Sequence, residues 1–157
     1  MSPDVLIIMG SKNDLPVGQK AVDTLRELGI SCEIKVASAH RTPKLVADIV
    51  ENSDAKVFIA IAGLAAALPG AVAAHTIRPV IGVPVSGKVN LDSVLSIVQM
   101  PPGIPVAAVG LDRGENAGLL AAQIIAVASP AVEKKLLEHR KAQEAKVHTD
   151  SSSLEVK

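Results

Sequence analysis

The chain has 157 residues, of which 48% are hydrophobic, with 16 basic and 16 acidic residues and therefore no net charge. This length suits one domain with a single core. The chain has no excess of positive charge that would indicate binding to nucleic acid or to an anionic membrane. Phe58 is the only aromatic residue, which disfavours base-stacking platforms and a flavin held between aromatic rings.

The cysteine content and the N-terminal sequence bear on the cellular compartment in which the protein is expected. Cys32 is the only cysteine, so the chain can form neither an internal disulfide nor a thiolate zinc site. The N-terminal sequence MSPDVLIIMG lacks the basic region and the long apolar run of a signal peptide. Val5–Met9 is too short to span a bilayer. We therefore expect a cytoplasmic protein that does not contact a membrane.

The first part of the chain predicts a strand, a helix and a second strand. Val5–Met9 is a continuous apolar run, which is typical of a strand buried on both faces. Asp14 predicts the cap of a helix with Pro16 in its first turn, and Gly29 predicts its end. Apolar and polar residues alternate over Cys32–Val36, which predicts a strand nearer the edge of a sheet.

Further strands and helices alternate through the rest of the chain. Thr42 and Pro43 predict a helix start, with Thr42 as the cap. The buried face of that helix is predicted to comprise Leu45, Val46, Ile49 and Val50. Strands are expected at 57–61, 80–83 and 106–109, and helices at 69–76, 91–99 and 115–128. A last amphipathic helix is expected to run from Pro130 to about Val147, and residues 149–157 are expected to be a disordered tail.

This alternation predicts an α/β fold, a three-layer α/β/α sandwich with a parallel sheet, followed by a C-terminal helix. No repeat or linker divides the chain, so we expect a single catalytic domain over 1–148. Right-handed crossovers put the loops after the strands at one edge, where ligands bind in such folds. The loops at 10–14, 37–41, 62–68 and 84–90 are therefore predicted to share one rim.

The loop after the first strand reads Gly10-Ser11-Lys12-Asn13-Asp14. Free N–H groups at a helix start favour a phosphate, and Ser11 can add a hydroxyl donor. Asp14 would repel phosphate but could hold a sugar diol. The alternative is a polar turn with a helix cap and no ligand, because the loop is neither a Walker loop nor a dinucleotide-binding fingerprint.

The loop after the second strand places Ser38, Ala39, His40 and Arg41 in one turn before the next helix. Arginine suits bidentate contact with phosphate or carboxylate, and histidine can move a proton near neutral pH. The alternative, a helix start with two solvated side chains, explains Thr42 but gives no reason for the His-Arg pair.

Other polar positions are weaker candidates. The third loop, with Gly63, Leu64, Ala67 and Leu68, offers backbone N–H groups and a small-residue wall but no side-chain chemistry. We expect His75, His139 and His148 to be surface or otherwise satisfied histidines, and no spacing predicts a metal site. The serines lack a nucleophile-elbow setting, which argues against a hydrolase triad. The polar loop 112–116 could cap a helix or line a subunit contact.

Five motifs occur in one order: MGSKND, ASAHRTP, AGLAAALPG, PVIGVPV and SIVQMPPGIPVA…GENAGLLAAQI. Together they resemble the N5-carboxyaminoimidazole ribonucleotide mutase and aminoimidazole ribonucleotide carboxylase family of purine biosynthesis, over about residues 5–128. SAHRTP is the most specific of them. The resemblance implies a flavodoxin-like fold, a homo-octamer in which the last helix reaches a neighbouring subunit, and no metal or organic cofactor.

The resemblance also implies roles for individual residues. His40 would be the general acid/base, Ser11 and Arg41 would lie near the phosphate, and Asp14 would lie at the ribose. The carboxylate would move from N5 to C4 through CO2 trapped in a closed pocket. The substrate-binding residues are expected to be Gly10, Ser11, Asn13, Asp14, Ser38, Ala39, Arg41, Gly63, Leu64, Ala67 and Leu68.

Two positions depart from the family pattern. Asn13 replaces a common serine but keeps hydrogen-bonding capacity. Ala67 stands where the mutase branch usually has histidine, so a polar contact to the substrate would be lost. The sequence of the third loop does not decide between the mutase and direct carboxylation of aminoimidazole ribonucleotide, so the second reaction is an alternative. A non-catalytic nucleotide-binding module on the same fold is a further alternative.

Overall fold

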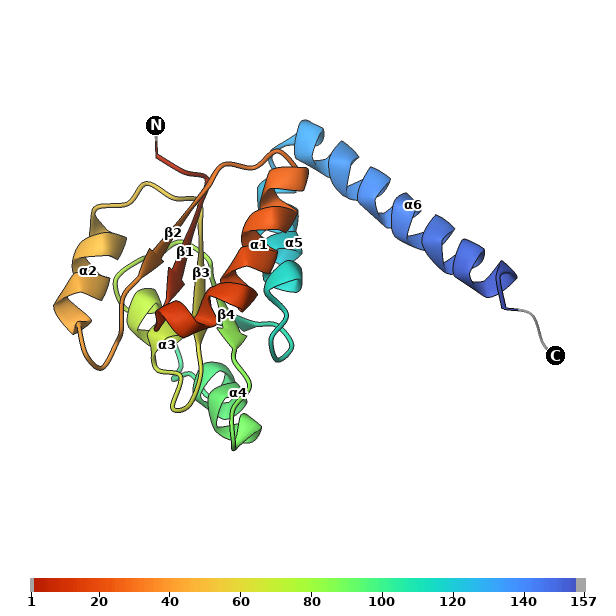
Figure 1. Ribbon diagram of the computed structural model, residues 1–157. Coiled ribbons are helices and arrows are strands. Elements are labelled where there is room, and N and C mark those ends of the chain that lie inside the picture. Colours follow the sequence, from red (N-terminus) through yellow and green to blue (C-terminus); the bar gives the residue numbers. More distant parts are fainter. Residues whose placement is uncertain (1, 155–157) are drawn as a thin grey trace.

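The computed structural model describes residues 2–154, and its centre is a five-stranded parallel sheet with strand order β2-β1-β3-β4-β5. The strands are β1 (Val5–Met9), β2 (Cys32–Val36), β3 (Val57–Ala62), β4 (Val80–Pro84) and β5 (Ala107–Ala108). The helices are α1 (Leu15–Glu27), α2 (Pro43–Glu51), α3 (Leu68–Ala73), α4 (Asn90–Val98), α5 (Gly114–Ala126) and α6 (Pro130–Ser152), with a short 3-10 turn over Lys12–Asp14. The predicted α/β sandwich with a parallel sheet is confirmed (Figure 1).

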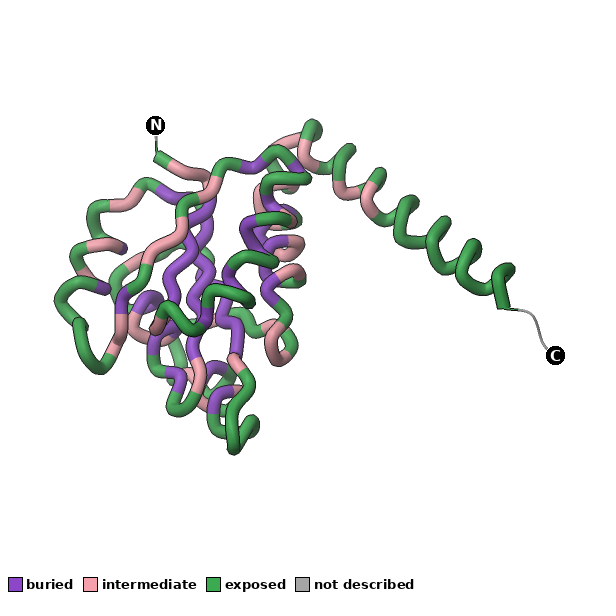
Figure 2. The backbone as a smooth tube through the Cα atoms, viewed as in Figure 1, coloured by how far each residue is buried: buried purple, intermediate pink, exposed green. Residues whose placement is uncertain are grey.

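Helices cover both faces of the sheet because successive strand residues point to opposite sides. Val5, Ile7 and Met9 face α1 and α5, whereas Leu6 and Ile8 face α2, α3 and α4. The three central strands are buried along their whole length, which explains why they read as continuous apolar runs (Figure 2). The two apolar layers therefore hold the sheet rigidly beneath its carboxyl edge.

Strand register aligns the ends from which the loops leave. Met9 of β1 pairs with Val36 of β2 and with Ile61 of β3, and Ala62 of β3 pairs with Pro84 of β4. The chain therefore leaves four neighbouring strands at the same edge of the sheet.

Several local predictions were wrong because tertiary contacts decided them. Leu45 was assigned to the buried face of α2 but is 44% exposed, whereas Ile49, assigned to the same face, is partly buried and packs against the core. Thr42 does not cap α2 with its side chain, because its hydroxyl bonds Ser38 instead. The Asp14 side chain likewise does not cap α1. β5 is limited to Ala107–Ala108, shorter than the predicted 106–109.

The last helix, α6, projects away from the sandwich (Figure 1). It ends at Ser152, beyond the predicted end near Val147, so residues 149–152 of the expected tail are helical. Residues 155–157 of that tail lie outside the described residues. None of the residues of α6 is buried (Figure 2). Among residues 2–154, no helix combines the length and apolarity needed to cross a bilayer.

Candidate active site

A pocket of about 600 Å³ lies at the carboxyl edge of the sheet, where the loops after β1, β2, β3 and β4 meet. All twelve residues predicted for the site line this pocket: Gly10, Ser11, Asn13, Asp14, Ser38, Ala39, His40, Arg41, Gly63, Leu64, Ala67 and Leu68. The prediction that the four loops lie together at one edge of the sheet is therefore confirmed.

The first loop is held by a reciprocal pair of hydrogen bonds. Ser11 Oγ accepts from the N–H of Asn13 at 3.2 Å, and Asp14 Oδ2 accepts from the N–H of Ser11 at 3.0 Å. This capping box closes the short turn before α1. Asp14 is only 9% exposed, and burial raises the pKa of its carboxyl, although the Ser11 N–H and the Arg41 charge act in the opposite direction.

The second loop is built around Ser38. Its Oγ accepts from both the N–H and the Nε of Arg41 at 3.2 Å, and its own N–H donates to Thr42 Oγ1 at 2.9 Å. Arg41 Nη2 donates to the carbonyl of Gly10 at 2.7 Å, which joins the first loop to the second. The guanidinium is thus positioned between the two polar loops, and the adjacent His40 is exposed at the pocket.

The third and fourth loops form the rest of the pocket lining, mostly with small or apolar side chains. Ala65, Ala66 and Ala67 line it, and Leu64 has a positive φ of 55° with its side chain 79% exposed. The Val85 N–H donates to the carbonyl of Ala62 at 2.9 Å, which joins these loops to each other. The loops after β1 and β2 therefore give the pocket polar groups, including an imidazole and a guanidinium, whereas the loop after β3 gives it only small or apolar side chains.

The site residues predicted from the sequence do not include one wall of the pocket. Val85, Ser86 and Gly87 line it without having been proposed as site residues. Their position after a buried strand was the available signal, since the predicted rim included 84–90.

The remaining histidines lie outside this pocket, but the prediction that all three are surface or satisfied histidines is wrong for His139, whose buried Nε2 has no hydrogen-bond partner within residues 2–154. His75 Nδ1 lies 2.9 Å from Glu51, and none of the three lines the pocket. Within residues 2–154, no group of three or more His, Cys, Asp or Glu side chains is arranged to hold a metal ion.

Comparison with known proteins gives one consistent result. The sequence model of the AIR carboxylase family matches residues 4–146. The N5-carboxyaminoimidazole ribonucleotide mutase of Methanocaldococcus jannaschii is 56% identical over 151 residues, which cover 96% of each chain. The protein of the same name from Pyrococcus abyssi is 51% identical and covers 88% of this chain and 82% of its own. The crystal structure of Treponema denticola PurE superposes with a TM-score of 0.87 at 30% identity, covering 97% of this chain and 98% of that one.

Proposed function

Because the chain belongs to the AIR carboxylase family, an assignment that rests on the match over residues 4–146, we propose that it acts in purine biosynthesis as an N5-carboxyaminoimidazole ribonucleotide mutase. The mutase activity is the one carried in the names of relatives that share about half of its residues across nearly the whole chain. In the proposed reaction, the carboxylate attached to N5 of the aminoimidazole is transferred to C4.

The convergence of two polar loops on one pocket is the observation that carries this proposal. We assign the phosphate of the ribonucleotide to Ser11 and Arg41, because a hydroxyl and a guanidinium are suitable partners for its oxygens. Asp14 would accept from the ribose hydroxyls. The contact of 2.7 Å between Arg41 and the Gly10 carbonyl supports a shared ligand, since it keeps these donors on one side of the pocket.

His40 is proposed to move the proton that the reaction requires. Breaking the bond between N5 and the carboxylate releases CO2 and leaves a nitrogen that takes up one proton. C4 then attacks CO2, and the proton on C4 must leave. A histidine that donates the first proton can accept the second, so the enzyme returns to its starting state without a co-reactant. The reaction as proposed uses no metal and no organic cofactor.

The apolar wall supports retention of CO2. Ala65, Ala66 and Ala67 line this part of the pocket, and their side chains carry no nucleophile that could react with CO2. CO2 is neutral and small, so a dry cavity holds it better than a specific charged partner would.

The remaining parts of the proposal concern the assembly and the compartment. We propose a homo-octamer in the cytoplasm. Leu137 is 57% exposed and Val147 is 67% exposed on the projecting α6, and subunit contact would cover such apolar side chains. The expected partners are the ribonucleotide and CO2, with no nucleic acid.

The proposal is tested by comparing the purified protein with its His40→Asn variant. Each is assayed with N5-carboxyaminoimidazole ribonucleotide, and separately with aminoimidazole ribonucleotide plus bicarbonate. We expect the wild-type protein to prefer the first substrate, and His40→Asn to lose turnover by at least about 100-fold while it still binds ribonucleotide.

His75→Asn is the matched control, because His75 lies outside the pocket and pairs with Glu51. It should leave turnover unchanged. Near-normal turnover in His40→Asn would remove the assigned proton-transfer group. If the protein instead prefers aminoimidazole ribonucleotide with bicarbonate, its activity would be assigned to direct carboxylation and not to the mutase reaction.

A further inference from the structure

The loop between β4 and α4 forms a wall of the pocket through its backbone. Its hydrogen bonds come from several elements: the Val85 carbonyl accepts from Ser93 Oγ at 3.2 Å, and the Gly87 N–H donates to Asn90 Oδ1 at 2.8 Å. The Ser86 N–H donates at 2.8 Å to Oδ1 of Asp112, a residue that follows β5. That bond joins the middle of this wall to the loop before α5.

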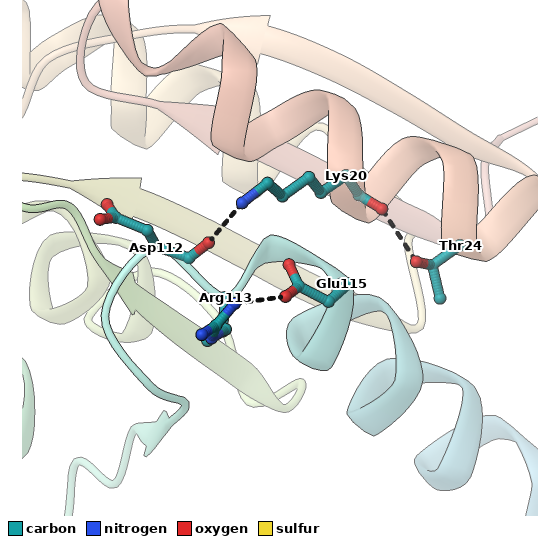
Figure 3. Close-up of polar contacts among 5 residues, drawn as sticks. All are labelled: Lys20, Thr24, Asp112, Arg113 and Glu115. Carbon is teal, nitrogen blue, oxygen red and sulfur yellow. Dashed lines mark hydrogen bonds and ion pairs between the residues drawn. The ribbon is translucent and has the colours of Figure 1, made fainter. Parts of the chain in front are cut away.

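Asp112 lies behind the wall and does not line the pocket. Its N–H donates to the Pro84 carbonyl at 2.9 Å, and its own carbonyl accepts from Lys20 Nζ of α1 at 3.2 Å (Figure 3). Its φ of 59° is in the left-handed region, which aspartate and asparagine adopt more readily than most residues. Both backbone groups and the side chain of Asp112 are thus engaged, with α1 and with the segment that joins β4 to α4.

The carboxylate of Asp112 is suited to hold an N–H group. Burial raises the pKa of this carboxyl, but the hydrogen bonds from Ser86 and the charges of Lys20 and Arg113 outweigh that effect, so its pKa lies below the usual range. An ionised acceptor makes a stronger hydrogen bond than a neutral one.

A helix cap does not account for this arrangement. The N-cap position of α5 is Arg113, which makes no capping hydrogen bond with its side chain. The Arg113 guanidinium instead pairs with Glu115 at 3.2 Å (Figure 3). The carboxylate of Asp112 is directed to the loop that borders the pocket.

We propose that Asp112 is a positioning residue for substrate binding, which fixes the pocket wall at Val85, Ser86 and Gly87 by holding the Ser86 N–H. The inference rests on the proposed function, because it concerns the ribonucleotide that the pocket is assigned to bind. Without the carboxylate, the wall keeps its contacts to α4 and the backbone bond from the Asp112 N–H to the Pro84 carbonyl, but the Ser86 N–H loses its partner in the loop before α5. The bound ribonucleotide would then have to order the wall itself, which weakens binding.

The test compares three variants with the wild-type protein. Asp112→Gly keeps the left-handed backbone and removes the acceptor, whereas Asp112→Asn keeps both the backbone preference and an acceptor oxygen. Glu115→Gln is the matched control, because it changes the neighbouring ion pair without touching the Ser86 contact. For Asp112→Gly we expect KM to rise about tenfold with kcat within about twofold, the size of effect expected for one hydrogen bond to a charged group. Asp112→Asn, which keeps a neutral acceptor, should show a smaller rise in KM than Asp112→Gly, and Glu115→Gln should remain close to wild type.

A second measurement needs no substrate. Amide hydrogen exchange at Ser86 should accelerate most in Asp112→Gly, less in Asp112→Asn and not in Glu115→Gln. If Asp112→Gly does not fold, Asp112→Ser, whose hydroxyl is one bond shorter than the carboxylate, replaces it in both measurements.

The outcomes separate the inference from the proposed function. An inactive wild-type protein would refute the proposed function. An active wild-type protein with an unchanged KM in Asp112→Gly, or an equal loss in Asp112→Asn, would overturn the role of Asp112 alone.

Discussion

Gly114 begins α5 at the point where that helix meets α1, and we predict that replacing it with alanine destabilises the fold. A Cβ at this position would overlap the carbonyl oxygen of Val17, and it would lie 3.0 Å from the carbonyl carbon of the same residue and 3.3 Å from the backbone nitrogen of Ala21. All three are backbone atoms of α1, so no side chain can rotate to make room. The two helices would have to separate.

The magnitude follows from two opposing effects. Overpacking a well-packed contact typically costs about 1–3 kcal/mol, whereas the better helix propensity of alanine recovers at most about 1 kcal/mol. Because the obstructing atoms belong to the backbone, we expect the steric cost to reach the upper end, which leaves a net loss of about 2 kcal/mol. For a chain of this size, that loss corresponds to a decrease in Tm of about 4–8 °C.

The assay is urea unfolding followed by circular dichroism, because the chain has no tryptophan or tyrosine to report by fluorescence. All proteins are compared at one subunit concentration. Gly87→Ala is the control, since a Cβ there would meet nothing within 4 Å. If Gly114→Ala unfolds within about 0.5 kcal/mol of the control, the close approach of α1 and α5 does not limit stability and the packing argument is refuted.

Three further predictions concern the pocket. Burial raises the pKa of Asp14 above 3.8 in the folded protein. Just above pH 3.8 the folded state therefore binds more protons than the unfolded state. The free energy of unfolding should then fall as the pH rises from 3.8 through the raised pKa of Asp14. Asp14→Asn should abolish this decrease in urea midpoints measured across the range, and an unchanged slope would assign it to other groups. Ser11→Ala should lower the free energy of unfolding by about 1 kcal/mol through loss of the cap to Asn13, and it should raise KM, with Ser11→Thr retaining both properties. Ala67 lines the pocket at the position where the resemblance to the mutase branch leads us to expect a histidine. Ala67→His should therefore raise kcat/KM about tenfold, the value of one added polar contact. Equal kcat/KM values would show that the side chain at this position does not affect catalysis.

Much of the site could be predicted because it depends on short stretches of sequence. The apolar run Val5–Met9 identified a buried strand, and parallel topology then placed the loop after it at the ligand edge. His40 and Arg41 stood out because nothing in a helix start requires an imidazole beside a guanidinium. In the structure both residues line the same pocket as Ser11, because the loops after β1 and β2 leave the sheet at the same edge, as predicted.

Side-chain partners were less predictable, because they depend on which segments become neighbours. Thr42 has the sequence of a helix cap, but its hydroxyl bonds Ser38 in the preceding turn. Leu45 follows the helical apolar pattern of α2 and still faces solvent. For Thr42 the local preference for capping gave way to hydrogen bonds within the preceding loop. For Leu45 the helical pattern gave way to the position of α2 in the fold.

The sequence by itself determined the parallel sheet, the four loops and the residues that could bind or move a proton, because hydrophobic periodicity and turn chemistry are local properties of the chain. Only the tertiary structure decided that Asp112 would hold the backbone of Ser86, 26 residues earlier. It also decided that Gly114 would meet the backbone of α1. Such contacts depend on the strand order and on the close packing of helices, and no pattern within either segment records them.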